Sequence, residues 1–174
     1  MRVTPPGGIA IITACLKRAG YSNIDLFDAT WFPIDTELAS ARADRDKERS
    51  KRGMMPEYTW DGTGFRIENV DMYDAWRDKV IDFNPDVIIS SLVEDTYFIW
   101  QKMMSRVIDQ SFISVVGGVF PTAAPHLFDD KCDYLCRGEG DEAIPEMMDY
   151  ISEGKSCKDL LNVWPNPLRP VVDV

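Results

Sequence analysis

The chain has little histidine and cysteine and no long hydrophobic run, and each shortage excludes a class of protein. Its 174 residues include one histidine and four cysteines, too few cysteines for the disulfide framework of a small secreted domain. No run of about 18 apolar residues could cross a bilayer, and no basic segment followed by an apolar one indicates a signal peptide. We therefore expect one soluble domain in a reduced, cytoplasmic setting, away from membranes.

Positive charge is also in short supply. Nineteen basic residues stand against 29 acidic ones, which gives a formal net charge of −10 and argues against nucleic acid as the main partner. The hydrophobic content of 45% is too high for a disordered polyelectrolyte. The composition therefore predicts a folded domain with a sizeable core.

Several motifs of catalysis and metal binding are missing. Neither the phosphate loop G-x-x-x-x-G-K-[ST] nor the dinucleotide fingerprint G-x-G-x-x-G occurs, and no carboxylate pair can be nominated for acid–base work. His126 lies in a proline-rich turn without a nucleophile motif around it. Cys132 and Cys136 have the spacing that begins a C-x-x-x-C-x-x-C iron–sulfur loop, but the third position is Glu139 and Cys157 lies far downstream. We interpret the cysteines as small buried residues, so no catalytic residue and no protein ligand to a metal is expected.

The first part of the chain predicts a helix and a short strand. Pro-Pro-Gly-Gly precedes residues 9–19, which end in Lys-Arg-Ala before Gly20, as is typical of a helix start and stop. Residues 24–28 predict a short strand. A doubly wound sheet normally has a strand before its first helix, and only eight residues precede residue 9. We therefore expect that first strand to be short or missing.

Residues 30–70 predict an excursion from the main fold. Residues 42–52 hold six basic and three acidic side chains, which favour a charged helix with a solvated face or, alternatively, a docking surface. Asp61-Gly62 lies between residues 57–60 and 63–67, as in a tight hairpin.

From residue 71 the chain alternates between helices and strands. Helices are expected at 71–83, 96–110, 121–128 and 141–152, and strands at 87–93, 112–116 and 134–136. This alternation predicts a doubly wound α/β fold with a parallel sheet covered on both faces, in which the strands at 87–93 and 112–116 are buried on both sides. Residues 171–174 are β-prone and could pair at an edge.

Ligands of such sheets bind beyond the carboxyl ends of the strands, which selects the loops at 28–31, 90–96, 117–122 and 137–141. Ser90 and Leu92 have the spacing S-x-L and are expected to share one face of a strand. Gly117-Gly118 would let a bulky group approach the backbone, or would simply form a tight turn. Arg137 could pair with Glu139 to stabilise its loop or could contact a ligand.

The order of these motifs resembles a known family. Pro-Pro-Gly-Gly-Ile-Ala before the first helix, Asn-Pro-Asp-Val-Ile-Ile-Ser-Ser-Leu, Val-Val-Gly-Gly-Val-Phe-Pro-Thr and Asp-Tyr-Leu-Cys-Arg-Gly-Glu-Gly-Asp-Glu-Ala follow one another. This succession is similar to the cobalamin-binding domain at the N-terminus of cobalamin-dependent radical S-adenosylmethionine (SAM) enzymes. The resemblance implies a flavodoxin-like (Rossmann-like) domain over residues 1–164, with the excursion inserted at about 30–70, and a linker from 165–174 into a radical domain that this chain lacks.

By resemblance, Ser90 and Leu92 would line a slot for the base of the cobalamin nucleotide tail, and the double glycine would let the tail pass. Cobalamin-binding domains also carry D-x-H-x-x-G, which does not occur here, so no histidine is expected on the cobalt. SAM and a 4Fe-4S cluster would be bound only in the absent domain. The cofactor-binding residues that the resemblance implies are Ser90, Leu92, Glu94, Thr96, Gly117, Gly118, Val119, Phe120, Arg137, Gly138, Glu139 and Gly140.

The resemblance implies a cobalamin-binding module that is not itself catalytic, within a methyltransferase or an enzyme of ring formation or rearrangement. Its expected partners are cobalamin and the radical domain. Two alternatives stay open: a cofactor-free docking domain of the same fold that acts through residues 42–52, and a flavodoxin-like flavin or nucleotide binder. An underfilled sheet could also recruit a strand from a neighbouring molecule, which makes an oligomer possible.

Overall fold

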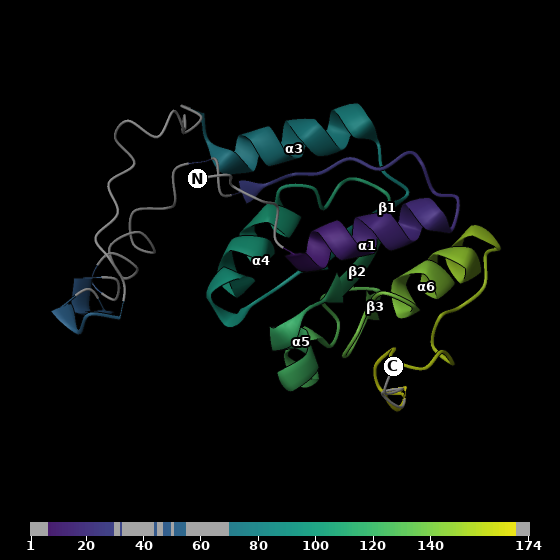
Figure 1. The fold of residues 1–174 in the computed structure, drawn as a ribbon. Helices are drawn as coiled ribbons and strands as arrows, with labels where there is room; N and C mark the ends of the chain where they lie inside the picture. Colours follow the sequence, from purple (N-terminus) through teal and green to yellow (C-terminus); the bar gives the residue numbers. More distant parts are fainter. Residues whose placement is uncertain are drawn as a thin grey trace.

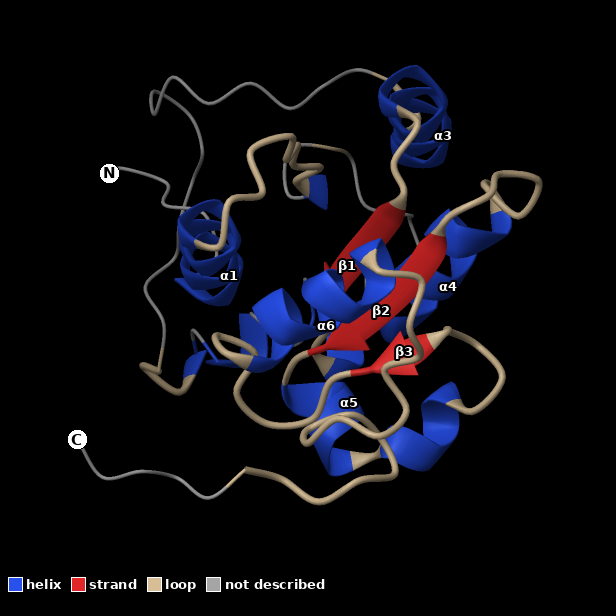
Figure 2. Cartoon of the chain, turned by 90° about the vertical axis from the view of Figure 1, so that its right-hand side faces the viewer, coloured by secondary structure: helices blue, strands red, loops and turns tan. Residues whose placement is uncertain are grey.

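A three-stranded parallel sheet organises the protein. The computed structural model describes residues 7–29, 32, 44, 47–49, 51–54 and 70–169. The strands lie in the order β1 (Val87–Ser91), β2 (Ile113–Gly117) and β3 (Tyr134–Leu135), and both pairings are parallel. The predicted α/β fold with a parallel sheet is confirmed, and Figure 2 shows the strands among the helices that cover them.

Helices pack on both faces of this sheet (Figure 1). On one face, α1 (Gly7–Arg18) and α6 (Ala143–Ser152) share a buried cluster with Val115 of β2. On the other, α3 (Met72–Phe83) packs through Trp76 against Ile88 of β1, and α4 (Tyr97–Ser105) packs through Trp100 against Val116 of β2. The two faces are called the α1/α6 face and the α3/α4 face below.

Helix α3 shows how local sequence fixes these elements. The Asp71 carboxylate accepts hydrogen bonds from the first-turn N–H groups of Tyr73 and Asp74, at 2.8 and 3.0 Å, which caps the helix. Trp76 and Val80 recur at helical spacing and are buried. Asn84 ends the helix with a φ of 47°, a left-handed conformation that asparagine tolerates. The predicted helix at 71–83 is confirmed.

The predicted strand at 24–28 is wrong, because these residues have no strand partner in the described structure. Ile24 packs beneath α1, whereas Phe27 stacks on Phe32 and meets the Trp76 ring edge-on. Asp25 is paired with Lys79. Side-chain contacts hold this segment in place, and it forms no strand hydrogen bonds with β1, which is the edge strand of the described sheet.

The strand predicted at 87–93 ends at Ser91, and burial on both sides is wrong for it. Ile89 is 36% exposed, whereas its register partner Val115 is 1% exposed. The reason is position: β1 is an edge strand and β2 is central. Burial on both sides is confirmed for β2, where Ser114 and Val116 are also buried.

Other boundaries differ by a few residues. The helix predicted at 96–110 is a 3₁₀ turn, η2 (Glu94–Thr96), followed by α4 and a turn. The helix predicted at 121–128 is split into α5 (Val119–Ala123) and a 3₁₀ helix, η3 (Pro125–Phe128). Pro125 causes the split because it has no N–H to continue the ladder. The last helix begins at Ala143 instead of residue 141.

The outer edge of β3 is covered by the end of the described chain. Val163 forms an antiparallel bridge with Cys136, and the Trp164 N–H donates to the Leu135 carbonyl at 2.9 Å. Arg169 pairs with Glu142 at 3.2 Å and also with Glu146. Residues 165–169, where a linker is expected to begin, are thus packed against the domain as far as they are described.

Little of the predicted excursion is described. Residues 44, 47–49 and 51 are helical and exposed, and Arg52 pairs with Glu48 at 3.1 Å, in agreement with a solvated helix face. The hairpin predicted at 57–67 and the β-prone residues 171–174 lie outside the described residues.

Candidate functional site

The loops after β1 and β2 are bonded to each other at the carboxyl edge of the sheet. The Leu92 N–H donates to the Gly117 carbonyl at 2.8 Å, and the Phe120 N–H donates to the Leu92 carbonyl at 3.2 Å. Parallel strands bring these loops to the same edge. The structure therefore joins the S-x-L segment and the double glycine, as the sequence predicts.

Gly118 is required by this contact. Its φ of 109° lies in the region that favours glycine, and a Cβ atom there would lie 2.6 Å from the Leu92 carbonyl oxygen and 2.7 Å from the Leu92 nitrogen. Backbone cannot yield to such an overlap. The tight-turn interpretation therefore holds for Gly118, because its missing side chain makes room for Leu92.

Gly117 is different. A Cβ atom there would meet only Cys136, at 3.5 Å from its carbonyl oxygen and 3.6 Å from its Cβ, which are ordinary van der Waals distances. The register pairs Gly117 with Ser91, so both lie on the α1/α6 face. Ser91 is exposed, and no hydrogen bond of its hydroxyl is found among the described residues. Bare backbone and an exposed hydroxyl thus lie side by side.

Ser90 and Leu92 lie on the opposite face of the sheet, the α3/α4 face. Ser90 is the register partner of Val116, which belongs to the cluster on the α3/α4 face, and Leu92 is 5% exposed within that same cluster. The prediction that the two share a face is confirmed, but Gly117 lies on the opposite one. Ser91 lies in the loop at 90–96 that the sequence selects, but it was not singled out there, because its position opposite Gly117 follows from the strand register.

Thr122 connects the loops after β2 and β3 and was also missed. Its hydroxyl donates to the Gly118 carbonyl at 2.8 Å and accepts from the Gly138 N–H at 2.9 Å. One side chain therefore sets the distance between the two glycine-containing loops. A threonine one helical turn after a glycine carries no sequence signal for this role.

The loop after β3 is held mainly by packing. The Glu139 carbonyl accepts from the Asn162 amide at 3.0 Å. A Cβ atom on Gly140 would lie 3.0 Å from Ile12 of α1 and 3.2 Å from Ile144 of α6, so this glycine allows the helices to approach. Arg137 forms no ion pair with Glu139; its guanidinium lies 4.9 Å from the centre of the Trp164 ring.

Apolar side chains are exposed at the same edge. Val93, just after β1, is 51% exposed, Val119, just after Gly118, is 74% exposed, and Phe98 in the first turn of α4 is 68% exposed. Glu94 is exposed and Thr96 half-buried, and the Thr96 hydroxyl bonds with the backbone of Val93. This rim suits a large ligand with apolar edges.

The cysteines do not form a reactive or metal-binding group. Burial raises the pKa of the Cys132 thiol to about 12 and that of Cys136 to about 11, and it also raises the pKa of Cys157. All three therefore stay protonated near neutral pH and are poor nucleophiles and ligands. No group of three or more His, Cys, Asp or Glu side chains suited to a metal occurs in the described part of the chain. His126, on η3, is exposed.

The fold and this edge define a class: a parallel α/β domain that presents bare backbone and an exposed apolar rim beyond the ends of its strands. The model of the B12 binding domain family matches residues 57–148, more than half of the chain. The protein belongs to this family, and the match supports cobalamin binding. Searches of curated proteins and of solved structures found no match. Among the described residues, no helix is both long and apolar enough to span a membrane.

Proposed function

We propose that the chain binds cobalamin across the carboxyl ends of its strands, as the N-terminal module of a radical SAM enzyme that transfers a methyl group or closes a ring. The observation that supports this location is the space at Gly117. A Cβ atom on Gly117 would be in ordinary contact with Cys136, and the exposed Ser91 lies beside the bare backbone of Gly117. The match to the B12 binding domain supports the choice of cofactor. The order of the sequence motifs supports the parent enzyme.

The residues at this edge fit the cofactor. A corrin ring is broad and carries apolar edges between amide side chains, which suits the exposed Val93 and Val119. The nucleotide tail needs close backbone approach, which Gly117 allows, and the Ser91 hydroxyl can bond to it. Bound cobalamin supplies a cobalt centre that accepts and donates an alkyl group. We propose that the protein holds and orients the cofactor, while SAM and the 4Fe-4S cluster belong to a domain beyond a linker that begins near residue 165.

Retention of hydroxocobalamin tests binding. The protein is incubated with the cofactor, free ligand is removed by gel filtration, and the corrin absorbance is compared with protein concentration. We expect about one corrin per chain, because one such edge exists per domain. A protein fraction without corrin absorbance would overturn the proposal.

Two variants locate the site. Gly117→Leu fills the space beside Ser91 and should lower cobalamin affinity at least about 10-fold, while circular dichroism and the melting temperature stay near those of the wild type. Ala14→Leu places the same side chain on the exposed side of α1 and should bind cobalamin normally. Equal cobalamin affinities of the two variants would show that the binding site is not at Gly117. Gly118 is unsuitable for this test because its substitution strains the fold itself.

The parent enzyme has a separate test. If the gene continues beyond Val174, a C-x-x-x-C-x-x-C loop in that continuation supports a radical domain, and its absence from a long continuation contradicts one. A cofactor-free docking domain is the second candidate function, supported by the exposed basic residues Lys47, Arg49 and Lys51. Corrin retention separates the two, and flavin absorbance in the purified protein would favour a flavin binder.

A further inference from the structure

Arg137 is a half-buried cation that has no carboxylate partner among the described residues. It lies two residues beyond the last residue of β3, at the carboxyl edge of the sheet, and its guanidinium lies over the Trp164 ring. Its Nε atom is buried and makes no hydrogen bond within the described structure. The Trp164 N–H is used by Asp129, whose carboxylate accepts from it at 3.2 Å. Buried polar groups are nearly always bonded, so an unbonded one indicates a missing partner.

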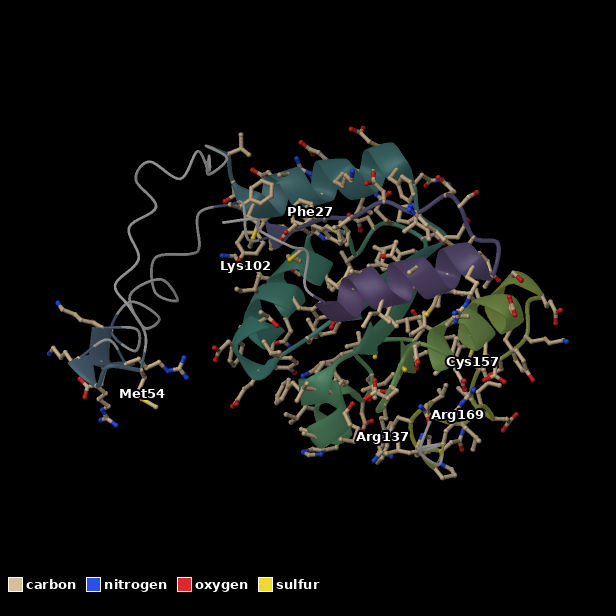
Figure 3. All side chains as sticks on the ribbon, in the orientation of Figure 1. Phe27, Met54, Lys102, Arg137, Cys157 and Arg169 are labelled. Carbon is tan, nitrogen blue, oxygen red and sulfur yellow. The ribbon has the colours of Figure 1, made fainter. Side chains whose placement is uncertain are left out.

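Arg169, in the same region, is an arginine whose charge is paired with carboxylates (Figure 3). Its Nε is also buried without a partner, but its terminal nitrogens pair with Glu142 and Glu146. The charge of Arg169 is therefore compensated within the domain. Among the described residues, the guanidinium of Arg137 has the Trp164 ring as its neighbour, and none of its terminal N–H donors is used by a carboxylate.

The surroundings make this cation distinctive. The three loops that follow the described strands, residues 90–96, 117–122 and 137–141, contain one basic residue, Arg137, and several acidic ones. In a chain of net charge −10, an anionic group arriving at this edge would otherwise be repelled. The planar guanidinium of arginine can bind phosphate through two parallel hydrogen bonds.

We infer that Arg137 binds the phosphodiester of the cobalamin nucleotide tail and so selects complete cobalamin over corrinoids without that tail. This inference rests on the proposed function. The phosphodiester is the anionic group of a ligand whose other peripheral groups are uncharged amides. Thr122 fixes the loop that carries Arg137 to the double-glycine loop through its bonds to Gly138 and Gly118, so the anion site and the open position at Gly117 belong to one edge.

Cobalamin and cobinamide, which lacks the phosphodiester and the base, form the test pair. Their dissociation constants are measured by absorbance or calorimetry for the wild type, Arg137→Gln and Arg137→Lys. Arg77→Gln is the matched control, because it removes one exposed arginine that pairs with Asp74 and Asp78 of its own helix. We expect Arg137→Gln to raise the dissociation constant for cobalamin about 10- to 100-fold and to change that for cobinamide by less than about twofold.

The lysine variant should lie between, because it keeps the charge but loses the planar fork. Raising the salt concentration should weaken cobalamin binding by the wild type and have little effect on Arg137→Gln. An equal loss for both corrinoids in Arg137→Gln would overturn the inference and leave cobalamin binding intact. Failure of the wild type to bind either corrinoid would overturn the proposed function and this inference together.

Discussion

The two edge strands of the sheet, β1 and β3, differ in how the chain covers them. At β3, the chain itself closes the edge: Val163 bridges to Cys136 and buried Asn162 bonds to the loops around it. At β1, the described chain offers no partner strand, and Ile89 is 36% exposed. The difference shows that the carboxyl edge is supported unequally: the loop after β3 is held by the end of the described chain, whereas the loop after β1 is bonded to the loop after β2 and its strand has an open flank.

The largest loss of stability is expected from a substitution of Asn162, at the β3 edge that the chain closes. Asn162 is 4% exposed, its amide donates to the Glu139 carbonyl, and its side-chain oxygen accepts from the Arg169 N–H at 2.6 Å. Asn162→Ala removes these bonds at a φ of 66° and should lower the free energy of unfolding by about 2–4 kcal/mol. Urea denaturation of the variant and the wild type measures this difference in free energy.

Asp130→Ala is the control for the backbone contribution, because Asp130 has a similar φ of 61° but is exposed. It should cost only about 1–2 kcal/mol. If the two substitutions cost the same, the bonds of Asn162 do not stabilise the closed edge.

Register partners on β1 and β2 compare the open side with the centre directly. Val115→Ala should cost about 2 kcal/mol or more, because Val115 is 1% exposed in the main core. Ile89→Ala removes a larger side chain from the same face, yet should cost about 1 kcal/mol or less because Ile89 is exposed on the edge strand. A larger loss at Ile89, measured by urea denaturation, would mean that another chain covers β1 in solution; light scattering would then show an oligomer.

The prediction for Thr122 concerns the connection between loops. Thr122→Val keeps the shape but removes the bonds to the Gly118 carbonyl and the Gly138 N–H. We expect a loss of about 1–2 kcal/mol in stability and faster hydrogen exchange at the Gly138 amide, followed by NMR. Thr122→Ser keeps the hydroxyl and should restore slow exchange; equal exchange in both variants would contradict the role.

The smallest effect is expected on the open side, at the ion pair of Lys79 and Asp25. The hydrogen bond from Lys79 holds the pKa of Asp25 below its ordinary value of 3.8, so the stabilisation is present above that value and is lost as the pH falls through the lowered one. Because both groups are exposed, Lys79→Met should cost under about 1 kcal/mol at pH 7. Urea midpoints of variant and wild type should converge as the pH falls through the lowered pKa of Asp25; a difference that stays constant as the pH falls contradicts the assignment.

The comparison of edges also explains what sequence could and could not predict. Alternation of apolar runs with capped helices was enough for the parallel sheet, for α3 and for the convergence of the S-x-L segment with the double glycine. The strand at 24–28 failed because pairing depends on a neighbouring strand, which local composition does not reveal. Ser91 and Thr122 were missed because their relation to Gly117 and Gly118 arises from register and loop contact.

Trp164 has a further consequence through its place beneath the Arg137 guanidinium. An indole emits in the near ultraviolet, where corrinoids absorb strongly, so a ligand that settles against Arg137 would take up that emission by energy transfer. The protein thus carries its own optical reporter at the rim, and titration followed by fluorescence quenching would need no label.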